Sequence, residues 1–272
     1  MPLKSVIYQM FEKKEKEPEK VALKLVNPID YKLLFVIFGL AVAFQIFVTL
    51  AQGGMEADLT IAAVSFGFPL SGSIAAFVVA RRYKSSKVFG RAYFALGLGM
   101  AMNFLGEVSY YILETMDLVT YPSISDVFYL AFYPLAFYHL AKNIQFFKPK
   151  VKIGIKILIV TIPVALIGTY SVLSYGLIGE MNSDYFYGLS YVVGSSVLLS
   201  GAIFGAMIFR QGVLGTAWLV LVIGMALLTL GDSWYAYLGT FSEYSSTHLV
   251  NLLWYAGYMV IAYALYKHQD TI

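Results

Sequence analysis

The chain has 272 residues, of which 59% are hydrophobic and 13% are charged, with a mean hydropathy of +0.72 and a formal net charge of +3. A soluble domain carries about 25% charged residues, so this composition indicates an integral membrane protein with little soluble mass. The absence of cysteine excludes disulfides, thiolate metal sites and cysteine nucleophiles, and the small net charge gives no support to nucleic-acid binding.

Residues 1–30 form a separate N-terminal segment. An amphipathic helix is predicted there by five apolar residues at helical spacing, Leu3, Val6, Ile7, Met10 and Phe11. A mixed-charge run over residues 12–20 follows, which a secretory signal peptide would not contain. Two interpretations stay open for this segment: a helix lying on the inner membrane surface, or a docking element for a protein partner.

Eight apolar stretches then follow, each long enough to cross a hydrocarbon layer of about 30 Å. They cover residues 31–51, 58–80, 89–114, 124–146, 153–176, 184–208, 213–238 and 246–267. The predicted fold is therefore all-α, a polytopic membrane protein with eight transmembrane helices. Pro69, Pro134 and Pro163 lie inside predicted spans and are expected to bend them, because each removes a backbone donor.

The basic residues predict the orientation of these spans. With a cytoplasmic N-terminus, all 19 Lys and Arg residues fall on the inner side. They occupy residues 4–32, 81–91 and 142–156, together with Arg210 and Lys267. Because Lys and Arg in short loops set orientation, we expect a multi-pass protein of the cell membrane with both termini in the cytoplasm.

An internal repeat divides the spans into two units, residues 31–146 and 147–272. Residues 90–143 recur at 215–268, shifted by 125 positions without a gap. Four crossings in each unit give both units the same orientation, related by an axis along the membrane normal. Several glycines of the repeat are expected at close contacts between helices, namely Gly97, Gly99, Gly106, Gly224 and Gly231.

The repeat also duplicates an acid, since Glu107 recurs as Asp232. A carboxyl group inside a membrane span is energetically expensive, which favours a functional use. Each unit is expected to present this acid on one helix and an acid or amide on the next, among aromatic rings at the outer side. The candidate ligand-binding residues are Asn103, Glu107, Tyr110, Asp126, Tyr129 and Tyr133 in the first unit, and Asp232, Tyr235, Asn251, Trp254 and Tyr258 in the second.

Three interpretations of the duplicated acids remain open. They are structural acceptors of hydrogen bonds, they line an outward-facing pocket for a small molecule, lipid or ion, or they form the acid–base pair of a hydrolase. No metal or cofactor is expected, because His139 is the only histidine placed inside a span and its repeat equivalent is Ala264. His248 is placed at the outer start of the last span and His268 in the tail.

Two segments resemble a known family. Gly106-Glu107, Tyr110 and the run TYPSISDVFYLAFYPL at 120–135 resemble a multi-helix membrane sensory domain that precedes bacterial diguanylate cyclases and histidine kinases, with its pattern PSxADxxYLxxYPL. The later segment of that domain is matched by Asp232, Tyr235-Ala236, Asn251, Trp254, Gly257 and Tyr258. The chain departs from the family pattern by carrying Glu107 for Asp, Ser125 for Ala and Asn251 for Asp.

The resemblance implies a membrane-embedded sensing module. Because the chain ends KHQDTI after its last span, we expect the output to pass through a protein partner at the cytoplasmic face. The N-terminal segment is the expected docking element for that partner. Membrane lipids are the other expected partners, and an oligomer is compatible with the sequence. More distantly, the GE and GD dipeptides and the helix number are similar to those of lysoplasmalogenases, which implies a lipid hydrolase as the alternative. An architectural subunit of a larger complex also stays open.

Overall fold

The computed structural model describes residues 29–51, 55–118, 122–147, 151–209, 215–241 and 247–271. These residues form eight helices and no strand: α2 (Tyr31–Leu50), α3 (Met55–Arg82), α4 (Phe89–Thr115), α5 (Ile124–Phe147), α6 (Ile153–Ile178), α7 (Ser183–Phe209), α8 (Gly215–Phe241) and α9 (Val250–Thr271). The predicted all-α fold of eight helices is confirmed. The amphipathic helix predicted within residues 1–30 lies outside the described residues.

Local sequence signals account for several helix ends. Asp30 caps α2, and its Oδ1 accepts a hydrogen bond of 2.9 Å from the Lys32 amide. Gly179 ends α6 in the left-handed region at φ 77°, which glycine adopts without a steric penalty. Pro69 and Pro134 lie inside α3 and α5, as the sequence predicted.

The helices differ in how apolar they are. Five of those described, α2, α3, α6, α7 and α8, are long and apolar enough to cross a membrane by length and composition. Large apolar side chains cover their outer faces, as Phe35, Ile74 and Val172 show with 85%, 55% and 72% exposure. Such a surface suits lipid contact and would be unfavourable in water. The protein is therefore a polytopic all-α membrane protein.

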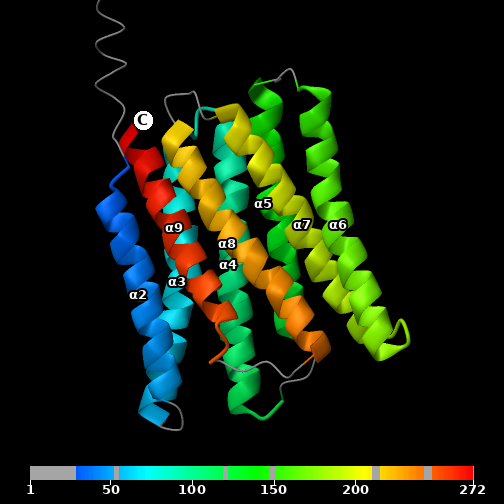
Figure 1. Cartoon of the computed structure of the whole chain (residues 1–272). Helices are drawn as coiled ribbons and strands as arrows, with labels where there is room; N and C mark the ends of the chain where they lie inside the picture. The colour runs from blue at the N-terminus through cyan, green and yellow to red at the C-terminus, as the bar shows by residue number, and fades with distance from the viewer. Residues whose placement is uncertain are drawn as a thin grey trace, which may run out of the picture.

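Six helices form a closed ring in the order α3, α4, α5, α7, α8 and α9, with α9 returning to α3. The repeat relates α3 to α7, α4 to α8 and α5 to α9, so the two contacts that close the ring, α3 with α9 and α5 with α7, are equivalent (Figure 1). The helices of the ring therefore contact one another in the same order in both units.

The two remaining helices break this symmetry. Helix α2 packs on α9 of the other unit, whereas α6 packs on α7 and α8 of its own unit. Two hydrogen bonds fasten α2: the Asp30 amide donates to the Tyr263 hydroxyl at 2.8 Å, and Gln45 Nε2 donates to the Thr247 carbonyl at 3.1 Å. The first helix thus bridges the units, although the duplication assigns it to the first.

Side chains at equivalent positions of the repeat are buried to the same extent inside the ring. Leu96 and Leu221 are both fully buried, as are Met100 and Met225. The repeated glycines are close-contact positions, as predicted. A Cβ at Gly224, for example, would lie 2.6 Å from Ile261 Cγ1 and 3.0 Å from the Gly257 carbonyl oxygen.

Basic residues gather at one end of the bundle. We call the end that contains the C-terminus of α9 the basic end, and α2, α4, α6 and α8 also begin there (Figure 1). It carries the described basic residues, Lys32, Arg81, Arg82, Lys84, Lys87, Arg91, Lys142, Lys152, Lys156 and Lys267. The opposite end, which we call the acidic end, carries Asp58, Glu114, Asp117, Asp126, Glu180 and Asp184.

Candidate functional site

Asp232 lies on α8 and is held by donors from both units. Its Oδ1 accepts a hydrogen bond of 2.9 Å from Trp254 Nε1 of α9, in the same unit. Its Oδ2 accepts one of 2.8 Å from the Tyr133 hydroxyl of α5, in the other unit. The Asp232 carboxyl group therefore accepts one hydrogen bond from each unit. We call the boundary between the two units at this point the seam.

Glu107 of α4 occupies the equivalent place. It accepts a hydrogen bond from Tyr129, the repeat equivalent of Trp254. Tyr258, the equivalent of Tyr133, lies close enough to interact electrostatically with both Glu107 and Asp232. Both predicted acids thus lie within electrostatic range of Tyr258, and each accepts a hydrogen bond from an aromatic side chain.

The glycine before each acid has a specific function in this arrangement. A Cβ at Gly106 would lie 2.5 Å from Tyr129 Cε1, and a Cβ at Gly231 would lie 2.6 Å from Trp254 Nε1. Each glycine makes room for the ring that donates to the following acid. The GE and GD dipeptides are therefore explained by packing and hydrogen bonding together.

Asp126 has a different function, at the start of α5. Its Oδ2 accepts hydrogen bonds from the Ser123 amide at 2.6 Å and the Ser123 hydroxyl at 3.1 Å, which forms a capping box. Its Oδ1 accepts a bond of 2.7 Å from the Tyr191 hydroxyl of α7. The repeat equivalent Asn251 is 2% exposed in the first turn of α9.

The other predicted residues surround these groups. Tyr235 packs against Tyr191 and Trp254, with ring centroids 6.2 and 5.8 Å apart. Tyr110 lies within electrostatic range of Glu107, and Asn103 is 4% exposed within α4. Contacts therefore connect Tyr235 to Trp254 and Tyr110 to Glu107, whereas Asn103 and Asn251 are placed by their burial alone.

Sequence reasoning missed Tyr191, which connects the two parts of this region. Its hydroxyl bonds Asp126, and its ring lies 6.2 Å from that of Tyr133. The residue 125 positions earlier is Phe66, which lacks a hydroxyl, so the repeat gave no signal for Tyr191. An aromatic residue in an aromatic-rich membrane chain is also unremarkable by itself.

The prediction that His268 lies in a tail beyond the last span is wrong. Helix α9 continues to Thr271, and His268 is fully buried near the basic end. His139 and His268 both pack on Trp218, with ring centroids 5.5 and 6.0 Å apart, and both pack on its repeat equivalent Tyr93, at 4.8 and 5.7 Å. The last span was ended too early because its final turn is polar in sequence, although that turn is covered by neighbouring helices.

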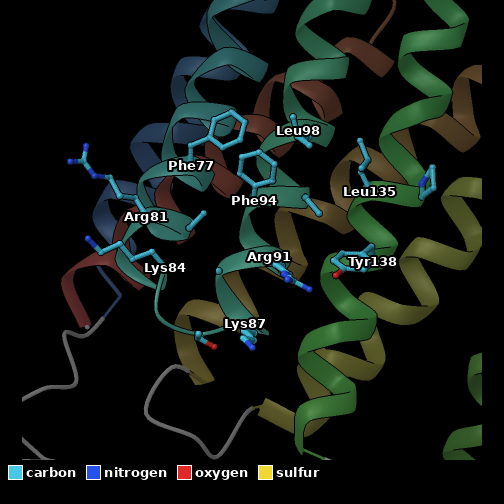
Figure 2. A pocket seen from close by; sticks show the side chains of 14 residues that line it. Phe77, Arg81, Lys84, Lys87, Arg91, Phe94, Leu98, Leu135 and Tyr138 are labelled. Carbon is cyan, nitrogen blue, oxygen red and sulfur yellow. The ribbon is translucent and has the colours of Figure 1, made fainter.

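Two cavities are described, and neither is lined by Glu107 or Asp232. The larger, of about 910 Å³, lies between α3, α4 and α5 at the basic end (Figure 2). The smaller, of about 360 Å³, lies between α5, α6 and α7 and is almost entirely apolar. The outward-facing pocket expected beside the acids is not one of these two, and the rings of Tyr129 and Trp254 pack against the glycines that precede the acids.

Comparisons with protein-family models, with curated proteins and with solved structures find no match for this chain. The fold and the seam define a duplicated, polytopic all-α membrane protein. Its function has to be argued from its own residues.

Proposed function

We propose that the protein is a membrane-embedded sensing module whose responsive groups are Glu107 and Asp232, and that their ligand is a proton or a small cation. The module lies in the cell membrane with both termini in the cytoplasm and acts through a protein partner there. The observation that carries this proposal is the pair of hydrogen bonds that Asp232 accepts from Tyr133 and Trp254, on opposite sides of the seam.

The chemistry of the donors favours a small cationic ligand. A tyrosine hydroxyl and an indole N–H are neutral, and the described Lys and Arg residues lie toward the other end of the bundle. A carboxylate in such a place has no opposite charge to balance it, and a proton or cation would supply that balance. A ligand of this size also needs no large cavity beside the acids.

The position of the acids supports a link from binding to conformation. Neutralising Asp232 weakens its charge-assisted bonds to Tyr133 and Trp254, and the Tyr133 bond holds helices of different units. A change at the carboxyl groups would thus alter how firmly the units are joined. Movement between α5 and α8 would reach the basic end, where a cytoplasmic partner could bind.

The lipid-hydrolase alternative receives less support. Paired carboxyl groups that act on a lipid need a cavity that admits the head group and a water molecule. Neither of the two cavities described above is lined by Glu107 or Asp232. An architectural subunit would have the same packing but no response to ions, so the experiment below separates it from a sensor.

The test uses the full chain reconstituted in nanodiscs. Infrared difference spectra between about pH 4 and about pH 9 report protonated carboxyl groups through their C=O stretch. Trp254 fluorescence, recorded in a Trp218→Phe/Trp234→Phe background, reports the donor to Asp232. We expect both signals to respond to pH or to added sodium or potassium, and Asp232→Asn to abolish the fluorescence response.

Glu107→Gln is expected to remove its own infrared component. The matched control is Asp184→Asn, which removes an exposed acid at the acidic end and should leave the fluorescence response unchanged. A carboxyl signal that titrates without any change at Trp254 would refute coupling. Absence of both responses in the wild type would assign the acids to structure alone.

A further inference from the structure

The larger cavity combines cationic and apolar side chains in one groove. It lies at the basic end, between the last turns of α3, the first turns of α4 and the facing side of α5 (Figure 2). Its lining includes four cationic residues, Arg81, Lys84, Lys87 and Arg91. Its apolar wall includes Phe77, Phe94, Leu98 and Leu135. No acidic residue lines it, so the groove itself offers no carboxylate to neutralise these cations.

The backbone around the groove is held in place. A Cβ at Gly90 would lie 2.7 Å from the Tyr83 carbonyl oxygen, so this glycine lets the loop approach α4 closely. Ser86 Oγ accepts a hydrogen bond of 3.1 Å from the Phe89 amide, and the Ser86 amide donates to the Tyr83 carbonyl at 2.8 Å. The loop that carries Lys84 and Lys87 is therefore fixed at both of its ends.

The apolar wall is shaped by another glycine. A Cβ at Gly97 would lie 2.7 Å from Phe77 Cδ1, so this glycine lets the Phe77 ring approach α4 closely. Phe77 also packs on Phe94, with ring centroids 5.4 Å apart. Figure 2 shows Arg91 projecting from α4 toward the side where Tyr138 of α5 lies, at the mouth of the groove.

The repeat shows that helix packing does not require these charges. Residues 81–91 contain five basic residues, whereas the equivalent residues 206–216 contain only Arg210. The apolar wall is kept in part, because Phe94 recurs as Leu219 and Leu98 as Ile223, whereas Phe77 recurs as Ala202. A cluster of cations that one copy carries and the other lacks is better explained by a ligand than by the fold.

We propose that this groove binds one anionic phospholipid, with its phosphate beside Lys87 and Arg91 and an acyl chain along Phe94 and Leu98. Basic pockets between helices at the end of a bundle suit anionic head groups, and an apolar wall directly beside them suits a chain. A neutral lipid would not balance the charge of the cations, and a free anion would not cover the apolar wall. This inference does not depend on the function proposed for Glu107 and Asp232.

The test measures lipid retention by native mass spectrometry of the purified full chain. The probes are phosphatidylglycerol and phosphatidylcholine with identical acyl chains. We expect the wild type to retain one phosphatidylglycerol in preference to phosphatidylcholine. The variant Lys84→Gln/Lys87→Gln/Arg91→Gln should lose about tenfold or more of that preference, because it removes three of the four cationic side chains that line the groove.

The matched control Lys32→Gln/Lys152→Gln/Lys156→Gln removes the same charge from the same end and should keep the preference. Leu98→Trp keeps every charge but occupies the wall, and it should reduce retention of the lipid. An equal loss in the control would overturn the site in favour of general surface attraction. Competition by glycerol phosphate as effective as that by the lipid would replace the phospholipid with a soluble anion. Circular dichroism checks that each variant is folded.

Discussion

The Tyr133 hydroxyl donates to Asp232 Oδ2 over 2.8 Å, and this bond connects α5 of the first unit to α8 of the second. The Tyr133 ring also occupies a space that α7 leaves open, since a Cβ at Gly194 would overlap it. Tyr133 thus inserts between two helices of the other unit and ends on a carboxyl group there. It fixes the register between the units more directly than a general apolar contact would.

Replacing Tyr133 by Phe should therefore destabilise the folded protein while preserving its shape. The substitution removes one of the two donors to Asp232 and leaves Trp254 as the other. Hydrogen bonds between membrane helices contribute about 1 kcal/mol, and bonds to a charged group somewhat more. We expect a loss of about 1–2 kcal/mol in the free energy of unfolding, measured by denaturant titration in mixed micelles.

Tyr175→Phe provides the control for this prediction. Tyr175 is 50% exposed on α6, so its hydroxyl faces the surroundings. Its removal should change the free energy of unfolding by less than about 0.5 kcal/mol. Equal effects of the two substitutions would mean that the Tyr133–Asp232 bond contributes nothing specific.

Gly106→Ala and Gly231→Ala should each destabilise the protein by about 1–3 kcal/mol, because the new methyl group overlaps the ring of Tyr129 or Trp254. Each substitution should also displace the donor from the neighbouring acid. Gly168→Ala on α6 is the control, since nothing lies within 4 Å of a Cβ there. Thermal unfolding of the three variants in one detergent measures the difference, and a loss at Gly168 as large as at Gly106 would contradict the packing argument.

The fold could be predicted from the sequence because hydropathy and charge act over whole spans. In lipid, a long apolar run has to be helical, and the basic residues of short loops fix which ends lie together. The internal repeat also identified Glu107 and Asp232 as equivalent positions, and equivalent residues in a two-fold arrangement are expected at equivalent depths.

The partners of the acids could not be predicted in the same way. A periodic pattern predicts which face of a helix a residue lies on, but not which helix of the other unit packs against that face. The hydrogen bond from Tyr133 to Asp232 could therefore not be predicted. The sequence does contain a signal for the capping function of Asp126, because a serine followed three residues later by an acid is typical of a capping box. The groove at the basic end was missed because its cations had been explained by orientation alone.

Two substitutions at the start of α5 should separate capping from contact between helices. Ser123→Ala removes a side chain that bonds Asp126 and should cost about 1 kcal/mol. Asp126→Ala removes the capping acceptor and also leaves the buried Tyr191 hydroxyl without its acceptor, so it should cost about 2–4 kcal/mol. Equal losses in denaturant titrations would show that the Tyr191 bond makes no net contribution.

His268 offers a test of whether the buried histidines are needed for their shape or for their polarity. Its Nδ1 faces the Ala264 carbonyl at 2.8 Å, whereas Nε2 is buried without a hydrogen-bond partner among the described residues. His268→Ala should cost about 2–4 kcal/mol, because it leaves a cavity against Trp218 and Tyr93. His268→Leu fills most of that space and removes the unsatisfied nitrogen, so it should be nearly neutral or stabilising in the same denaturant titration. A loss in the Leu variant as large as in the Ala variant would mean that the imidazole makes a polar interaction its packing does not reveal.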